Sequence, residues 1–439
     1  MGIYNFFKLQ GISLMPEKKV PSARSQASFL MDRILGEKRL LADLNLNSIV
    51  QNVSTADRAR SQRLLLNTLR SLERADALIL PFLKKRPNLK ILNVLRLATV
   101  EIMDNGDAHG IVNEYVSIIG RNKRLKNYKG LVNAVLRKVS HSDKSIWNKL
   151  DIPQLPKWLR RILLDSYGIS VTQKIERQHL ERPPVDITIK NSKLMEYFSI
   201  ELKGTQIFKH SLRLKNAGQI SALPGFTEGE WWVQDLSASI PVCLFKEIKG
   251  KSALDLCAAP GGKTMQLSAA GADVTAVDIS DVRVSKLKEN LTRTSLDANI
   301  IISDLFKIKD CFDVIILDAP CTATGTIRRH PDLPYVKPKA DLSKLFHLQY
   351  KMLEHAISLM TGTSQLVYCT CSLLPQEGEH QVKKLLTNFH DLRVDEYLPQ
   401  DLVFLESYRT EEGGLRLLPN HFADKGGIDG FYIAKLVKV

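Results

Sequence analysis

The chain has 439 residues, of which 44% are hydrophobic and 25% are charged. This composition excludes a disordered chain, a collagen-like fibre and a small disulfide scaffold, and the length predicts two or three domains. The net charge of +15 is uneven, because residues 1–150 hold 26 Lys and Arg against 12 Asp and Glu, or +14. A basic module therefore precedes a nearly neutral one. Basic surface suits a phosphate polyanion such as nucleic acid, although charge alone also fits a generically basic protein.

Residues 1–20 are interpreted as an N-terminal extension. Their short apolar stretch is broken by Lys8 and has no convincing cleavage site, and Phe6 stands where a myristoylation motif needs a small hydroxyl residue. Either Met1 or Met15 can be the true start. No apolar run in the chain approaches the ~20 residues of a membrane-spanning helix, so we expect no membrane contact.

Residues 21–145 have a helical pattern. Leucine and isoleucine recur near the 3.6-residue period between Leu30 and Leu44 and again between Leu64 and Leu78. We predict a bundle of about six helices. Its densest basic clusters, the candidate nucleic-acid contacts, are Lys84–Lys90 and Arg121–Gly130.

Prolines mark the next boundary. Pro153 and Pro156 precede a short helix that we expect to end near Gly168, and a double proline leads into the strand that follows Pro184. Residues 150–230 are therefore predicted to form a linker helix and a small α+β subdomain.

From residue 231 to residue 439, short apolar strands alternate with helices. The expected strands read SALDLC, DVTAVD, NIIISD, DVIILD and SQLVYCTC. This alternation is typical of a doubly wound, Rossmann-like α/β fold, in which ligands bind at the carboxyl ends of the strands. The strand-ending residues should therefore meet at one edge of the sheet: Asp255–Cys257, Asp278, Asp304, Asp318 and Cys371.

The first of these strands runs into DLCAAPGGKT, Asp255–Thr264. Its small residues let a ligand approach the backbone, and the helix after it offers free N–H groups. A P-loop also ends in GKT, but it needs glycine where this chain has Cys257. We predict a nucleoside ligand, with Asp278 on the ribose hydroxyls and Asp304 on the amino group of the base. Helix capping is the alternative role for each acid.

The cysteines have no secreted-domain spacing, so we expect a reduced, cytosolic protein. They are Cys243, Cys257, Cys311, Cys321, Cys369 and Cys371. Cys321 and Cys371 follow strand ends, in DAPCTATGTIRRHPD and YCTCSLLPQEGE, where a helix N-terminus can lower a thiol pKa. The other four are interpreted as structural. Cys369 and Cys371 lack the further ligands of a zinc site, so no metal is expected.

A thiol and a carboxylate beside a nucleoside site match methylation at carbon 5 of a pyrimidine. That carbon is a poor nucleophile until a cysteine adds at carbon 6 and gives carbon 5 enamine character. A nearby acid can assist at ring nitrogen 3. Release requires loss of the carbon 5 proton and elimination of the thiol, and the base must first leave its stack.

These motifs resemble those of the Sun/Fmu family of RNA (cytosine-5)-methyltransferases, as do the flanking segments VQDLSAS and IDGFYIAKL. The resemblance implies that Cys371 is the nucleophile, that Cys321 assists product release and that Asp318 faces the base. It also implies a S-adenosylmethionine site lined by Cys257, Ala258, Ala259, Pro260, Gly261, Gly262, Lys263, Asp278, Asp304 and Asp318. Cys369 stands where the family commonly has serine.

Within the helical module, Ile111–Val139 resembles the RNA-binding NusB-like domain. A NusB-like domain ahead of this catalytic domain is the arrangement of the bacterial RsmB type. That implies methylation of one cytosine in 16S, small-subunit ribosomal RNA by a cytoplasmic enzyme, which we expect to be a monomer. A tRNA cytosine-5 methyltransferase stays open, because the catalytic motifs do not encode the RNA. A non-catalytic antitermination or ribosome-assembly factor is disfavoured by the intact Cys321, Cys371 and Asp318.

Overall fold

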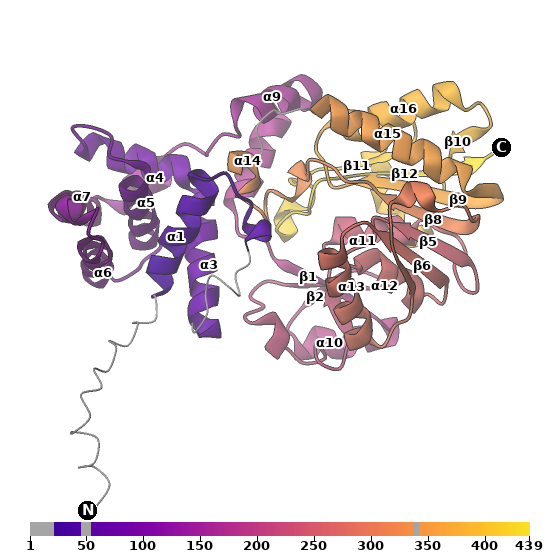
Figure 1. The fold of residues 1–439 in the computed structure, drawn as a ribbon, viewed down its shortest axis with the longest axis horizontal. Coiled ribbons are helices and arrows are strands. Elements are labelled where there is room, and N and C mark those ends of the chain that lie inside the picture. Colours follow the sequence, from indigo (N-terminus) through magenta and orange to yellow (C-terminus); the bar gives the residue numbers. More distant parts are fainter. Residues whose placement is uncertain (1–21, 45–53, 337–341) are drawn as a thin grey trace, which may run out of the picture. The chain divides into compact units, whose positions relative to one another are not determined.

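The computed structural model describes residues 22–44, 54–336 and 342–439. The chain divides into two compact units, Met1–Leu150 and Asp151–Val439 (Figure 1). The predicted extension at residues 1–20, with both candidate start residues, lies outside the described residues.

The first unit is built from helices. In residues 22–44 and 54–150 the α-helices are α1 (Ala23–Leu35), α3 (Thr55–Arg70), α4 (Leu72–Ile79), α5 (Leu89–Met103), α6 (Ala108–Arg121), α7 (Lys129–Ser140) and α8 (Lys144–Lys149). Short 3₁₀ helices join them: η1 (Leu41–Asp43), η2 (Leu80–Phe82) and η3 (Lys126–Tyr128). The helical bundle expected from the periodicity is confirmed, and the described residues of this unit contain seven α-helices where about six were expected.

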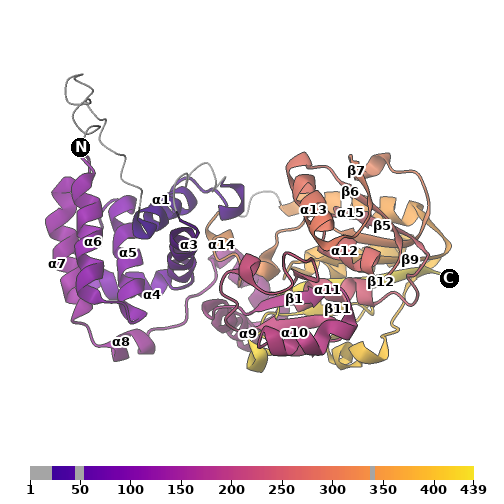
Figure 2. The ribbon, with the colours of Figure 1, turned by 90° about the horizontal axis from the view of Figure 1, so that it is seen from below.

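Helix α5 is the centre of this unit, where it packs against α1, α3, α4, α6 and α7. Every residue from Ile91 to Val100 is buried, as expected for a helix that is apolar around most of its circumference. Its buried Arg96 is paired, because Nε donates to Asp76 Oδ1 at 2.6 Å. Helices α6 and α7 lie side by side (Figure 2). The exposed basic cluster Arg121–Gly130 covers the turn between them.

The second unit begins with α9 (Lys157–Leu180). The predicted helix end near Gly168 is confirmed, because Gly168 has non-helical backbone with a φ of +74°. A second helical segment follows directly and continues to Leu180, and α9 includes both segments. Buried apolar residues on both sides of the kink, Leu163 and Ile175, explain why the helix resumes.

A small antiparallel sheet follows, in the order β2-β3-β1-β4. Its strands are β1 (Val185–Ile189), β2 (Thr205–Phe208), β3 (Ser211–Leu214) and β4 (Trp231–Val233). Helix α10 (Met195–Glu201) packs on this sheet through Met195 and Phe198, which share a core with Trp231. This is the α+β part of the predicted fold.

The large sheet has the order β10-β12-β9-β8-β5-β6-β7, with β11 paired to β12. Its strands are β5 (Ser252–Leu256), β6 (Asp273–Asp278), β7 (Asn299–Ile302), β8 (Phe312–Asp318), β9 (Met360–Thr370), β10 (Leu392–Val394), β11 (Leu415–Leu417) and β12 (Phe431–Lys438). Strands β5 to β9 are parallel, and β12 pairs antiparallel with β9, β10 and β11. The predicted doubly wound α/β fold is confirmed, and the strands at one edge of the sheet, from β12 to β10, are antiparallel to their neighbours.

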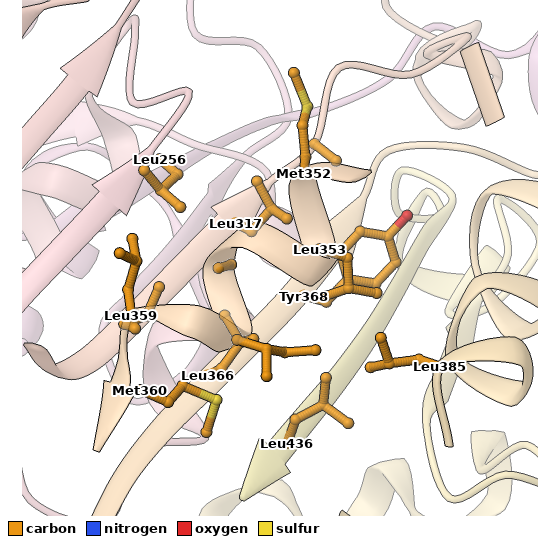
Figure 3. Close-up of a cluster of buried hydrophobic side chains, with 14 of the residues drawn as sticks. Leu256, Leu317, Met352, Leu353, Leu359, Met360, Leu366, Tyr368, Leu385 and Leu436 are labelled. Atoms are coloured by element: carbon orange, nitrogen blue, oxygen red, sulfur yellow. The ribbon is translucent and has the colours of Figure 1, made fainter. Parts of the chain in front are cut away.

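Helices cover both faces of this sheet. They are α11 (Leu236–Cys243), α12 (Gly262–Ala269), α13 (Asp281–Thr294), α15 (Leu342–Ser358) and α16 (Glu379–Asn388). A further short helix, α14 (Leu333–Val336), lies in the chain between β8 and α15. On one face, Leu353 of α15 and Leu385 of α16 pack over Leu317, Tyr368 and Leu436 of the strands (Figure 3). On the other face, α11 and α12 form a second core with β5, β8 and β9.

The strand order places β5 between β6 and β8. The chain therefore leaves β5 toward one side of the sheet and later returns on its other side at β8. Such a switch point opens a crevice at the carboxyl ends of the strands, where ligands bind in doubly wound folds. The loops after β5, β8 and β9 carry the three sequence motifs.

Candidate active site

Cys321 and Cys371 come together at the carboxyl edge of the sheet. Strands β8 and β9 are parallel neighbours in which Asp318 pairs with Cys369, so the loops that follow them start side by side. The two sulfurs lie 3.4 Å apart. A backbone hydrogen bond from Gly325 N to Cys371 O, at 3.0 Å, ties the two loops.

The contact between the two sulfurs alters the acidity of Cys321. Its hydrogen bond with Cys371, and next its burial, raise the pKa of the Cys321 thiol well above the ordinary value. Either sulfur of the pair can be the donor. The prediction of a lowered thiol pKa is wrong for Cys321, because its neighbours are a second sulfur and the Glu377 carboxylate.

Asp318, the last residue of β8, is paired with Lys263 of α12. Lys263 Nζ donates to Asp318 Oδ2 at 2.7 Å. Burial alone would lower the pKa of Lys263, but the Asp318 carboxylate outweighs it and the pKa is raised. The ammonium also lies 5.2 Å from the centre of the Phe431 ring. A fixed positive charge thus stands at the carboxylate predicted to face the base.

The loop after β5 approaches its neighbours too closely for larger side chains. Gly261 has a φ of +107°, and a Cβ there would lie 2.4 Å from Leu287 Cδ1. Helix α12 begins at the next residue, so its first amides point out of the helix without intrahelical partners. This arrangement is suited to a polar ligand group.

Asp255 supplies a buried carboxyl group beneath this loop. Thr264 Oγ1 donates to its Oδ2 at 2.6 Å, whereas Oδ1 is buried and has no hydrogen-bond partner among the described residues. Burial raises the pKa of Asp255 to about 7. An unpaired acceptor of this kind fits a ligand that carries hydrogen-bond donors or positive charge.

A cavity of about 540 Å³ joins these features. The predicted site residues that line it are Ala258, Ala259, Pro260, Gly262, Lys263, Asp318 and Cys371. Other predicted residues lie outside its lining: Cys257, Gly261, Asp278, Asp304 and Cys321. Cys321 nevertheless contacts the cavity residue Cys371 directly.

The two acids predicted to hold the nucleoside are engaged elsewhere. The Asp278 side chain is wholly buried, and its carboxylate accepts from Ala259 N at 3.1 Å, from Ser280 N at 2.9 Å and from Arg283. Asp304 does not end its strand as predicted, because β7 stops at Ile302. It caps a 3₁₀ helix, η6 (Leu305–Lys307), by accepting from Phe306 N at 3.1 Å.

Comparison with known proteins decides the family. The NusB family model matches residues 21–141, and the model of the 16S rRNA methyltransferases RsmB/F matches residues 242–437. Ribosomal RNA small subunit methyltransferase B of Escherichia coli O6:H1 is 32% identical over 444 residues, covering 96% of this chain and 100% of the relative. The Salmonella arizonae protein of that name is 31% identical over the same shares. The chain belongs to the RsmB/F family.

Solved structures share the fold. The crystal structure of PH0851 superposes with a TM-score of 0.73 at 20% identity, covering 95% of this chain and 99% of that chain. NSun6 from Pyrococcus horikoshii, solved with SFG, has a TM-score of 0.55 at 19% identity, covering 66% of this chain and 100% of that chain. At these identities the likeness concerns the fold alone.

This RsmB/F chain is thus a small-subunit ribosomal RNA methyltransferase, with S-adenosylmethionine as its cofactor. The residues present fit that cofactor, since the unpaired Asp255 oxygen and the loop amides line or adjoin the cavity. No helix in the described ranges is long and apolar enough to span a bilayer.

Sequence reasoning missed one cluster of charged residues in this RsmB/F site. Asp235, Arg329 and Asp429 also line the cavity and are joined to one another. Arg329 Nε donates to Asp429 Oδ2 at 3.0 Å, and Arg329 also pairs with Asp235. The fully buried Arg328 bridges the same two acids. The available signal was their position inside the motifs VQDLSAS, TIRRHPD and IDGFYIAKL.

Proposed function

We propose that this chain methylates carbon 5 of a cytosine in 16S ribosomal RNA through a covalent bond between Cys371 and carbon 6 of the base. The observation that carries the proposal is the cysteine pair, with sulfurs 3.4 Å apart and Cys371 lining the cavity with Asp318 and the loop after β5. One cysteine is enough to attack carbon 6. A second sulfur in contact with the first serves the release step.

For the attack, Cys371 is the member of the pair that acts as nucleophile, because it lines the cavity and Cys321 does not. As the sulfur adds to carbon 6, negative charge develops on the pyrimidine ring. Asp318 and Lys263 stand as a hydrogen-bonded pair on the cavity wall, and the Lys263 ammonium stabilises that charge. The proton that the Cys371 thiol loses passes through Asp318 to ring nitrogen 3 and completes the addition.

S-adenosylmethionine, when bound, supplies the methyl group as an electrophile to carbon 5. The loop Ala258–Lys263 and Asp255 are the residues best placed to hold it. The proposed contacts of Asp278 and Asp304 with the nucleoside remain predictions. For Asp278 to reach the ribose, Arg283, whose side chain is 52% exposed, must release the carboxylate.

For release, carbon 5 must lose its proton and the bond between Cys371 and carbon 6 must break. Once Cys371 is bonded to the base, the hydrogen bond that chiefly raises the Cys321 pKa is weakened. Cys321 can then give its own proton to solvent and accept the proton of carbon 5. Elimination returns the electron pair to the Cys371 sulfur, which takes back its proton from ring nitrogen 3 through Asp318. The step balances with one proton released.

For the RNA contacts, we propose that residues 21–145 are the RNA-binding domain, followed by the subdomain at residues 150–230 and the catalytic domain at residues 231–439. The exposed clusters Lys84–Lys90 and Arg121–Gly130 supply charge suited to phosphates. A cytoplasmic monomer remains our expectation.

The test is methylation in vitro of 16S ribosomal RNA, with bulk tRNA in parallel, followed by nuclease digestion and mass spectrometry of the nucleosides. We expect 5-methylcytidine in the ribosomal RNA only, and bisulfite sequencing then locates the cytosine. Product in tRNA alone would favour the tRNA enzyme. A methylated nucleoside other than 5-methylcytidine would refute the proposed chemistry.

A further inference from the structure

Glu377 is a buried carboxylate behind the two cysteines. It ends the 3₁₀ helix η8 (Pro375–Glu377), and its exposed fraction is 0%. It is not among the residues that line the cavity of about 540 Å³, so it has no contact with the space for base and cofactor. The chemistry proposed above gives it no role.

Each oxygen of Glu377 accepts two hydrogen bonds. Oε1 accepts from Thr322 N at 2.9 Å and from Gln349 Nε2 at 2.9 Å. Oε2 accepts from Thr322 Oγ1 at 2.5 Å and from Ser372 Oγ. Thr322 directly follows Cys321, and Ser372 directly follows Cys371. One carboxylate therefore holds the neighbour of each cysteine.

Surrounding contacts hold Glu377 itself in place. Gln349 of α15 uses the same amide group to donate to Pro320 O at 2.8 Å, just before Cys321. Tyr368, labelled in Figure 3, donates its hydroxyl to Glu377 O at 2.8 Å. Glu377 is thus held at its carboxylate by α15 and at its main-chain carbonyl by β9.

We propose that Glu377 is a positioning residue for the cysteine pair, which sets the separation of the Cys321 and Cys371 sulfurs by holding Thr322 and Ser372. The inference rests on the proposed covalent function. A carboxylate suits the task because it offers acceptors only, so four donors can converge on it. Alanine would remove the carboxylate oxygen that accepts from the buried Thr322 N–H, and glutamine would present an NH₂ group where one oxygen now accepts.

The first experiment measures the sulfur pair without any methylation. Diamide oxidises two adjacent thiols to a disulfide and is itself reduced to the hydrazine, and peptide mass spectrometry identifies the Cys321–Cys371 bond. We expect Glu377→Ala to slow formation of this disulfide by about 10²-fold, the cost of a displacement near 1 Å. Glu377→Gln should lie between Glu377→Ala and the wild type. Glu411→Ala, at a side chain that is 88% exposed, is the matched control.

The second experiment measures the attack. In a Cys321→Ala background, Glu377→Ala should slow formation of the covalent RNA adduct by a similar factor, whereas affinity for S-adenosylmethionine and the thermal unfolding midpoint should stay close to those of the control. Wild-type rates of both disulfide and adduct formation in Glu377→Ala would overturn the proposal.

If Glu377→Ala does not fold, two smaller changes test the same proposal. Thr322→Val and Ser372→Ala each remove one hydroxyl donor and leave the carboxylate in place. Unchanged disulfide rates in both would overturn the proposal. If wild-type protein makes no 5-methylcytidine, the proposed function fails, and the diamide comparison still decides whether Glu377 positions the sulfurs.

Discussion

The Cys321 and Cys371 sulfurs lie in hydrogen-bond contact across 3.4 Å, so two cysteines that are 50 residues apart meet at the wall of the cavity. The pair is unsymmetrical, because Cys371 lines the cavity and Cys321 does not. On this asymmetry the proposed function assigns attack to Cys371 and release to Cys321, and each role can be removed separately.

Cys371→Ala should abolish methyl transfer and leave cofactor binding intact, because the variant lacks the nucleophile and keeps the loop after β5. Transfer of labelled methyl groups to 16S ribosomal RNA and isothermal titration with S-adenosylmethionine measure the two properties. A variant with near-normal transfer would place the nucleophile elsewhere.

Cys321→Ala should accumulate a covalent RNA–protein adduct, because attack by Cys371 remains while the release step is lost. The adduct would appear as a denaturation-resistant band of lower mobility in a gel. The double variant Cys321→Ala/Cys371→Ala is the control and should show no such band. Rapid multiple turnover without adduct would argue against the release role.

Asp255 should make stability depend on pH between about 4 and 7. Its folded-state pKa, about 7, is raised by burial above the ordinary 3.8, so protonation stabilises the folded chain. This stabilisation is complete below pH 4 and is lost as the pH rises through 7, by up to about 4 kcal/mol. Asp255→Asn should remove that part of the slope, as urea unfolding at pH 5 and pH 8 can measure. An identical slope in both proteins would contradict the prediction.

Neutralising the exposed clusters should weaken RNA binding. Replacing the basic residues of Lys84–Arg86 and Arg121–Lys126 by glutamine is expected to lower affinity at every RNA sequence tested and to flatten its dependence on salt, by a slope of about 0.9 for each lost phosphate contact. Filter binding between 50 and 300 mM salt, on the order of physiological strength, measures both. The control replaces Lys249 and Lys251, which are exposed in the second unit. If the cluster variant kept wild-type RNA affinity and salt dependence, the two clusters would not be RNA contacts.

Local chemistry made part of the site predictable. Strand-ending residues such as Asp318 can be recognised from apolar runs, and parallel strands bring such residues to one edge. The strand end was predicted too far along the chain for Asp304, because β7 ends two residues earlier and a side chain after a strand can cap the next turn instead.

The sequence by itself determined the helical and α/β parts and the positions of the motifs that carry the candidate site, because periodicity and motif spacing are local properties of the chain. Only the tertiary structure decided that the Cys321 and Cys371 sulfurs are in contact, that Asp318 is paired with Lys263, and that Glu377 joins the two cysteine loops. These facts depend on distances and burial between segments as much as 55 residues apart, where hydrogen bonds and pKa values are set by neighbours that only folding supplies.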